Sequence, residues 1–339
     1  VPVQGGTTLQ GAAQAVRAGH APVTVTFHVN PGTFAQLTDS SGVFDTVRTA
    51  QILPGGNAYT PLSVGSGGVG YHPLAAGTTV TNVTIPGFVT NPSYSFTTTT
   101  ITAPTLSFSS PVVGAGLQMS TYASLGAPAP AGAVATVKSL NPAVLIIADS
   151  ITKAGGDSAM IPLTTSTTTF YFYPQALEGT INDSARIVVS IPGYKSDSLW
   201  GYVRQSAIAI ANLPTATTTF TAKSQFYALI GVPYAGNTSM YQYQAIRAGA
   251  SPLTVTFHTA QPAVGKLTDS SLTQDTVRTA VVPVNPASGI YYTPTTVASG
   301  GVAYQPVGPG TSTTWATAPG LITLPADTVK TTVSAPVIS

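Results

Sequence analysis

Two stretches of this chain repeat one another at a fixed distance. Residues 16–28 read VRAGHAPVTVTFH and residues 246–258 read IRAGASPLTVTFH, with nine of thirteen positions identical at an offset of 230. At the same offset, residues 37–50 (LTDSSGVFDTVRTA) and 267–280 (LTDSSLTQDTVRTA) share eleven of fourteen positions. A self-match of this length indicates a duplicated structural module, and it constrains the fold more strongly than any local motif.

The match continues beyond a short insertion. Residues 59–73 and 292–306 share ten of fifteen positions at an offset of 233, which places a longer loop around residues 286–289 of the second copy. The middle third of the chain aligns more weakly, because VATVKSLN at 134–141 resembles VTVTFHVN at 23–30. The sequence therefore predicts three modules in an A-B-A pattern.

Composition favours an all-β fold. Charged residues make up only 6% of the 339 residues, against about 25% in ordinary soluble domains. Threonine and valine are abundant, and β-branched side chains suit pleated surfaces. The 28 prolines and 33 glycines separate short apolar runs as turn residues. We therefore expect three tandem immunoglobulin-like β-sandwiches, over residues 1–103, 104–217 and 218–339.

Charge and hydropathy exclude several classes of partner. A net charge of +2 from 12 basic and 10 acidic residues provides no patch for nucleic acid or anionic lipid. No apolar run approaches the roughly 18 residues of a membrane-spanning helix.

The sequence starts VPVQGG, without an initiator Met or a signal peptide, which fits a mature, processed or excised product. Scarce charge, threonine-rich strands and glycosylation sequons favour an extracellular or cell-surface location.

The segments that join the modules also read as strands. Residues 95–103 (SFTTTTITA) and 216–222 (ATTTFTA) are rich in β-branched residues and unlike flexible Gly/Ser linkers. We expect the last strand of one module to run almost directly into the first strand of the next, which would make the junctions stiff.

The two ends of the chain carry complementary features. Residues 332–339 (TVSAPVIS) align with residues 100–107 (TITAPTLS) at the first junction, so the C-terminal segment 329–339 is interpreted as having the sequence of a first strand. The third module is preceded by a predicted strand at 220–230 that the first module lacks. Either the chain is a piece of a longer array, or the C-terminal strand of one copy completes the first module of the next. Strand addition of this kind satisfies an open sheet edge and propagates head to tail.

The second alternative predicts self-association into a homopolymer, with a contact between the two ends of successive copies. The residues predicted to form this subunit interface are Thr332, Val333, Ala335, Pro336, Val337, Ile338, Val1, Pro2 and Val3.

Four stretches carry a resemblance to a known family: residues 141–163, 168–194, 253–258 and 292–306. Their TVT strand, bulky PAVL strand and Pro-Gly-Tyr turn resemble the tandem bacterial immunoglobulin-like (Big-type) repeats of large secreted or surface-displayed proteins. The likeness covers nearly the whole chain. It implies immunoglobulin-like sandwiches that serve as stalks, spacers and adhesive or filamentous scaffolds. The acidic cluster that fixes calcium between modules in many adhesins is not found in the sequence, so calcium-stiffened linkers are not predicted.

Two motifs that could carry chemistry have simpler structural explanations. Residues 65–70 (GSGGVG) match the dinucleotide-binding fingerprint, but no helical pattern follows, and the duplicate ASGGVA at 298–303 breaks the motif. A glycine-rich turn is the better interpretation. His28 and His258 end equivalent strands, and the chain has no cysteine, so we predict local hydrogen bonds and no zinc site.

Acidic residues do not form a predicted catalytic pair. Asp39 and Arg48 recur as Asp269 and Arg278, and each aspartate is followed by two serines. This pattern predicts a turn in which the carboxylate accepts hydrogen bonds from nearby backbone amides. We accordingly predict no enzyme activity, no cofactor and no metal site.

Aromatic and glycosylation signals complete the surface prediction. Alternation along residues 170–173 (FYFY) places Phe170 and Phe172 in a core and Tyr171 and Tyr173 on a surface. Exposed aromatic residues on one face would indicate carbohydrate binding. Sequons for N-glycosylation occur at Asn82, Asn182 and Asn237.

These observations predict a structural extracellular protein, a subunit of a surface filament or stalk built from immunoglobulin-like modules. Two alternatives stay open. One is an adhesin or carbohydrate-binding module that recognises glycans or a host or cell surface. The other is an accessory region of a larger secreted enzyme.

Overall fold

The computed structural model describes residues 13–56, 58–89, 95–284 and 289–336. The chain is all-β, and in these ranges only three short 3-10 turns accompany the strands. It forms two compact units, the N-terminal unit Val1–Pro104 and the C-terminal unit Thr105–Ser339. The two units meet between residues 104 and 105, and the sequence predicted the first module boundary between residues 103 and 104. The insertion predicted around residues 286–289 lies almost wholly outside the described residues.

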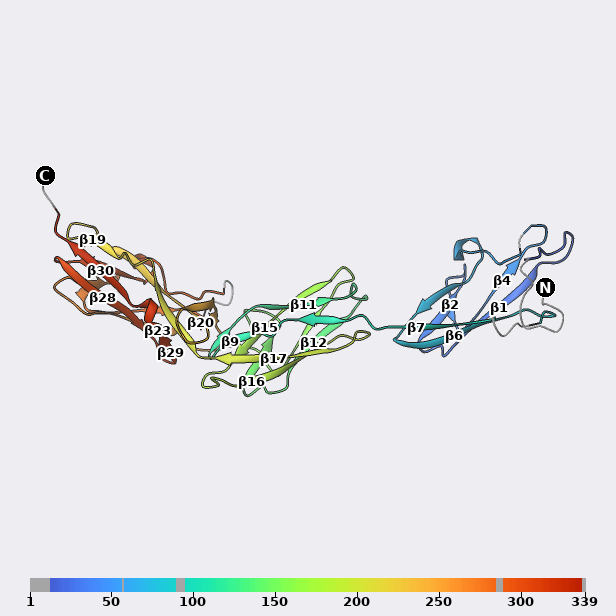
Figure 1. The fold of residues 1–339 in the computed structure, drawn as a ribbon, viewed down its shortest axis with the longest axis horizontal. Coiled ribbons are helices and arrows are strands. Elements are labelled where there is room, and N and C mark those ends of the chain that lie inside the picture. Colours follow the sequence, from blue (N-terminus) through green and yellow to red (C-terminus); the bar gives the residue numbers. More distant parts are fainter. Residues whose placement is uncertain (1–12, 57, 90–94, 285–288, 337–339) are drawn as a thin grey trace. The chain divides into compact units, whose positions relative to one another are not determined.

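The N-terminal unit contains two small facing sheets (Figure 1). One has the strand order β4-β1-β6-β7 and the other has the order β3-β2-β5. A small core of Val29, Ala35 and Leu37 lies between them. The elements are β1 (Val23–Asn30), β2 (Ala35–Thr38), β3 (Phe44–Asp45), β4 (Val47–Ile52), η1 (Val64–Ser66), β5 (Gly70–Pro73), β6 (Gly77–Thr84) and β7 (Phe96–Ile101).

The C-terminal unit begins with a sandwich that we call the middle sandwich. Its sheets have the orders β22-β10-β15-β11-β8 and β14-β12-β16-β17-β9, where β22 (Ala245–Ile246) joins from a later segment of the chain, and β13 also pairs with β15. Phe170 and Phe172 are buried in its core and Tyr171 is exposed, which confirms the predicted alternation of this strand. The strands are β8 (Leu106–Phe108), β9 (Val112–Gly114), β10 (Leu117–Gln118), β11 (Thr121–Leu125), β12 (Val134–Ser139), β13 (Leu145–Ala148), β14 (Ser158–Pro162), β15 (Thr169–Ala176), β16 (Ser184–Ser190) and β17 (Asp197–Arg204).

The remaining strands form the third sandwich. Its sheets have the orders β25-β24-β27-β20-β18-β29 and β19-β30-β28-β23-β26, and β21 pairs with β20. The elements are β18 (Ser206–Ala211), β19 (Ala216–Thr218), β20 (Ser224–Pro233), β21 (Met240–Tyr243), β22 (Ala245–Ile246), β23 (Leu253–Thr259), β24 (Gly265–Thr268), β25 (Gln274–Asp275), β26 (Val277–Val282), η2 (Val297–Ser299), β27 (Val302–Pro306), β28 (Gly310–Thr317), β29 (Leu321–Thr323), η3 (Pro325–Asp327) and β30 (Val329–Ser334).

Both sandwiches of the C-terminal unit have immunoglobulin-like connectivity at their opening strands. In each, an early strand pairs antiparallel with the next long strand, as β8 does with β11 and β18 does with β20. A following short strand crosses to the other sheet and pairs in parallel with the last strand, as β9 does with β17 and β19 does with β30. Two sheets joined in this way bury a shared core between them.

The junction between these two sandwiches is almost without linker. Only Gln205 separates β17 of the middle sandwich from β18 of the third. This agrees with the expectation that one module runs directly into the next. The boundary predicted between residues 217 and 218 falls inside the third sandwich, because β18 pairs with β20 and β19 pairs with β30.

Buried glutamines hold the two sandwiches together. Gln244, which is 2% exposed, accepts a hydrogen bond from Gly114 N (2.8 Å) and donates one to Val112 O (2.7 Å). Gln118 pairs with Ala245 across β10 and β22 and accepts a hydrogen bond from Ala248 N (3.3 Å). These amides satisfy backbone groups that would otherwise be buried without partners.

An ion pair lies at the partly exposed edge of the same junction. Arg247 donates to both carboxylate oxygens of Glu178, with Nη2 lying 2.8 Å from Oε2. Burial acts to raise the pKa of Glu178, but the hydrogen bonds and positive charge of Arg247, together with a backbone hydrogen bond, outweigh it, so the pKa lies below its usual value. Because Glu178 is more than half exposed, this pair adds little to stability.

Candidate assembly site

The duplicated strands occupy identical positions in the two copies. Val23 pairs with Ile52 in the N-terminal unit, and Leu253 pairs with Val282 in the third sandwich. Each pairing is shifted by 230 residues, so β1 and β4 correspond to β23 and β26. β2 corresponds to β24 at the same shift, β5 to β27 and β6 to β28 at a shift of 233, and β7 to β30 at a shift of 232. The third sandwich therefore shows what surrounds each of these strands in a complete module.

The last strand of the N-terminal unit has an open outer edge. In the third sandwich, β30 pairs with β28 on one side and with β19 on the other, where Thr332 N donates to Thr215 O (2.9 Å). The equivalent strand β7 pairs with β6, and no strand among residues 13–56, 58–89 and 95–104 pairs with its other side. Within those residues the outer edge of β7 has no strand partner, and an unpaired edge of this kind can accept another strand.

The second sheet of the N-terminal unit is open at the matching place. In the third sandwich, β27 lies between β24 and β20, and Phe226 of β20 pairs with Val302. The equivalent strand β5 pairs with β2 alone within the described part of the unit. As a result Tyr71 is 36% exposed, whereas its counterpart Tyr304 is completely buried. That burial raises the pKa of the Tyr304 hydroxyl.

The missing neighbours leave the core between the two sheets incomplete. In the third sandwich, Phe226 contacts Phe257 edge to face with ring centroids 5.2 Å apart, and both rings are fully buried. Phe27 occupies the position of Phe257, opposite Arg48, but it is only partly buried. The N-terminal unit thus presents two open backbone edges beside an apolar core that lacks one layer of side chains.

The predicted donor residues fall into two groups in the structure. Thr332 and Val333 lie in β30, which is bonded on both edges within its own sandwich. Ala335 and Pro336 follow directly after that strand. The interpretation of all of 329–339 as a first strand is therefore corrected for 329–334, which form a last strand. The remaining predicted interface residues, Val337, Ile338, Val1, Pro2 and Val3, lie outside the described residues.

The recurring Asp–Arg pairs stabilise equivalent turns. Asp269 Oδ1 accepts hydrogen bonds from Ser271 N (2.9 Å) and Ser271 Oγ (2.6 Å), and Arg278 lies 3.5 Å from Asp269 Oδ2. Asp39 accepts the same bonds from Ser41. The side-chain hydrogen bond from the serine is the main cause that lowers the pKa of each aspartate. The predicted turn is confirmed.

This turn makes a pH-dependent contribution to stability. The folded-state pKa of Asp269 is lowered, so its contribution is present above the unfolded pKa of about 3.9 and is lost as pH falls through the lower folded value. Asp269→Asn should lower the unfolding free energy at pH 7 by no more than about 1 kcal/mol. The difference from the wild type should close below about pH 3. Urea unfolding at pH 7 and pH 2.5 measures it, and a gap that persists at pH 2.5 would contradict the assignment.

The other candidate motifs are structural. Residues 64–66 form the 3-10 turn η1, and Gly67 follows with a φ of 94°, so the glycine-rich segment is the predicted turn. His28 and His258 each lie within hydrogen-bond distance of a threonine, Thr84 and Thr317, as predicted. In the described ranges, no group of three or more His, Asp or Glu side chains could hold a metal ion, and no helix is long and apolar enough to cross a membrane.

The sequons lie on accessible backbone. Asn82 is exposed on β6, and Asn182 and Asn237 are exposed in turns with φ of 66° and 56°. All three side chains are therefore placed where a glycan could be attached.

Sequence reasoning did not anticipate Gln244 or the tyrosines beside it. The signal that was available is the alternating YQYQ at 241–244, which places two tyrosines on one face and two glutamines on the other. Which face is buried depends on the neighbouring sandwich, and the local sequence does not reveal that neighbour.

Comparison with known proteins identifies no family. No family model matches the chain, and no curated protein matches it. Among solved structures, DIP-gamma IG1+IG2 aligns with 69% of this chain and 99% of its own at 11% identity and a TM-score of 0.23. The Yersinia pseudotuberculosis adhesin InvE aligns over 69% and 58% at 12% identity and a TM-score of 0.20. A β-glycosidase from Bacteroides vulgatus aligns over 69% and 25% at 9% identity and a TM-score of 0.23. With scores this low, none of these structures indicates a function for the chain.

Proposed function

We propose that this protein is an extracellular structural protein, a subunit of a surface filament or stalk made of three immunoglobulin-like modules in an A-B-A pattern. Its resemblance to tandem bacterial immunoglobulin-like repeats fits this role. Successive copies join head to tail, because a short segment of one copy adds to the open edge of the first module of the next.

The open outer edge of β7 is the observation that carries the proposal. Its duplicate β30 has that edge covered by β19. A bare strand edge beside an unfinished core invites addition of a strand from another chain. The added strand would form backbone hydrogen bonds along this edge, as β19 does along β30 in the third sandwich.

Residues 335–339 are the segment that we assign to donation. They follow β30 directly, so they can leave the third sandwich without breaking its sheet. The strands that cover a last strand in this chain, β9 and β19, are each only three residues long. Three donated residues would therefore suffice to play the same part, alongside Thr100 and Ile101 of the next copy.

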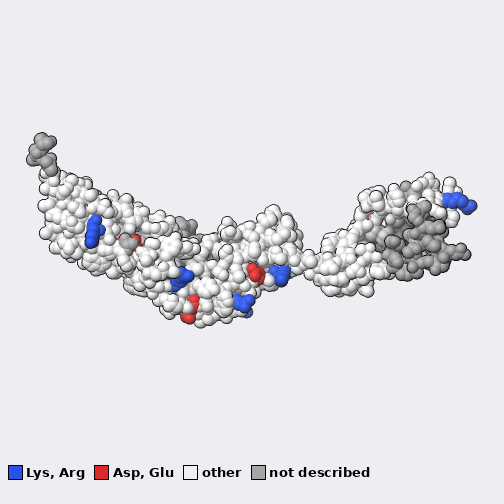
Figure 2. Space-filling model, in the orientation of Figure 1, with Lys and Arg blue, Asp and Glu red and all other residues white. Residues whose placement is uncertain are grey.

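The surface composition supports close packing of many copies. Only a few isolated charged side chains appear on the face drawn in Figure 2, amid a large neutral surface. Bringing neutral surfaces together avoids the cost of removing charges from water. Such a surface suits a protein that packs against other copies of itself.

Deleting residues 335–339 tests the proposal. We expect the shortened chain to stay folded, because β30 remains intact, and to lose filament formation in negative-stain electron microscopy and sedimentation velocity. Deleting 332–339 is a weaker test, because it also removes half of β30. Val307→Thr, a neutral change at an exposed position of the third sandwich, is the control and should assemble normally. Normal filaments from the shortened chain would refute donation by this segment.

A further inference from the structure

A run of tyrosines covers part of one surface of the third sandwich. Its members come from three separate segments of the chain. Tyr243 stacks on Tyr291 with ring centroids 5.3 Å apart and planes within 8°. The rings form two groups, Tyr234 with Tyr241, and Tyr243, Tyr291, Tyr292 and Tyr227 in succession, with centroid separations of 5.1–6.0 Å between the contacting pairs.

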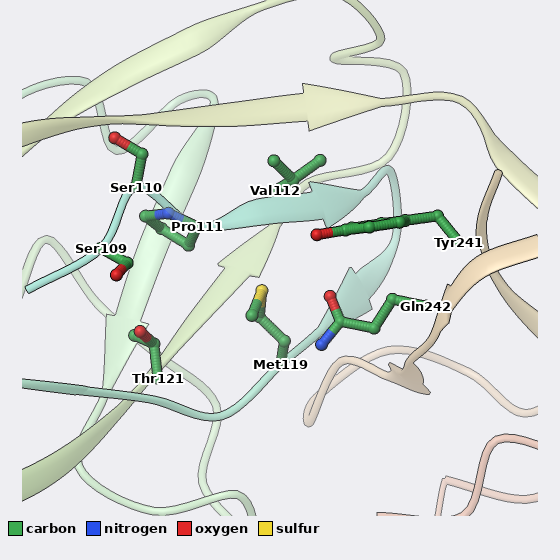
Figure 3. Close-up of a pocket in the computed structure, with 8 residues that line it drawn as sticks. All are labelled: Ser109, Ser110, Pro111, Val112, Met119, Thr121, Tyr241 and Gln242. Carbon is green, nitrogen blue, oxygen red and sulfur yellow. The ribbon is translucent and has the colours of Figure 1, made fainter. Parts of the chain in front are cut away.

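One end of this run opens into a pocket of about 380 Å³. Tyr241 and Gln242 of β21 extend toward Pro111 and Met119 of the middle sandwich (Figure 3). The hydroxyl groups of Ser109, Ser110 and Thr121 also line the cavity, and none of its lining residues is Asp, Glu, Lys, Arg or His. The pocket thus combines one aromatic wall with hydroxyl and amide groups, and it carries no formal charge.

The duplicated module does not need these rings in order to fold. The positions of Tyr241, Tyr243 and Tyr291 correspond to Gly11, Ala13 and Ala58 in the first copy of the sequence. Tyr243 lies opposite Gly231, so part of its role is to cover a strand that has no side chain there. Tyr241 does not cover a glycine in this way, and it is 54% exposed.

We propose that the Tyr241 pocket and the adjoining tyrosines bind a neutral carbohydrate chain. The apolar faces of sugar rings can lie against exposed aromatic rings, and sugar hydroxyls can exchange hydrogen bonds with the serine, threonine and glutamine side chains. The lack of charge favours a neutral glycan over an acidic or phosphorylated one. Two groups of rings carried on the same strand, β21, suit an extended polymer better than a single small molecule. The site lies wholly in the C-terminal unit and is independent of strand donation.

Affinity electrophoresis of the full chain tests this site. We expect the protein to be retarded in gels that contain at least one of hydroxyethylcellulose, laminarin or dextran, and not in gels that contain alginate alone. Tyr241→Ala should weaken the association at least tenfold, and Tyr241→Phe, which keeps the ring, should weaken it by no more than about threefold. Tyr122→Ala is the matched control, because Tyr122 is equally exposed and contacts Tyr171 on another surface.

Three results would overturn the proposal. The first is migration unaffected by all three neutral polysaccharides, which would leave a protein partner as the better explanation of the tyrosines. The second is equal retardation of the wild type and Tyr241→Ala. The third is retardation by alginate alone. A matching unfolding midpoint for Tyr241→Ala and the wild type ensures that a loss of binding reflects the site.

Discussion

Phe257→Ala should lower the unfolding free energy of the C-terminal unit by about 3–5 kcal/mol. The Phe257 ring is completely buried and contacts Phe226 edge to face, so its removal leaves a cavity and an unpaired aromatic neighbour. Urea unfolding of the full chain, followed for the transition of each unit, measures the loss. The large effect should fall on the C-terminal transition alone.

Phe27→Ala is the matched control, because it removes the same side chain from the duplicate position. Phe27 is only partly buried, so the cost to the N-terminal unit of an isolated chain should be about 1–2 kcal/mol. Equal costs in the isolated chain would mean that the first module is already complete without a donor.

Gln244→Ala should destabilise the C-terminal unit by about 2–4 kcal/mol. It removes the buried side-chain amide that is the partner of two backbone groups, so Gly114 N–H and Val112 C=O lose hydrogen bonds in a buried region. Thermal unfolding should show the middle and third sandwiches separating into two transitions, and hydrogen exchange at Gly114 should accelerate.

Gln205→Ala provides the comparison for that variant. Gln205 also bonds across to the third sandwich, through Gly320 O at 2.8 Å, but this bond is exposed. Its loss should cost under about 1 kcal/mol, because water can replace the partner. If the two glutamine variants behave alike, burial of the Gln244 amide is not what couples the sandwiches.

The duplicated strands were predictable because their signals are local. The alternation in LTVTFH and the Asp-Ser-Ser turn each need only neighbouring residues, and both copies adopt the same register. The Phe170 and Phe172 pair was predictable for the same reason. These features depend on strand periodicity and turn chemistry, which the chain carries in every window of a few residues.

The prediction for the C-terminal strand was wrong because its match to the first junction was taken to mark the start of a module. The match also fits the end of a module. Residues 332–334 match residues 100–102, and that segment is the end of a last strand, β7, and not the start of a first strand. Only Leu106–Phe108 begins the following module. A β-branched run looks the same at the end of one module and the start of the next, so pairing partners alone distinguish them.

The glutamine junction and the tyrosine run depend on contacts between distant segments. Gln244 contacts residues about 130 positions earlier, and Tyr243 stacks on Tyr291 from another part of the fold. Sequence reveals such sites only after the sheets have been assembled.

Electron microscopy of the native filament, at a resolution that traces the polypeptide across the subunit boundary, tests strand donation most directly. The account predicts residues 335–339 of one copy lying alongside Thr100 and Ile101, at the outer edge of β7 in the next copy. Density that runs covalently from Ser339 into further chain, or a β7 edge covered by residues of the same copy, would contradict it.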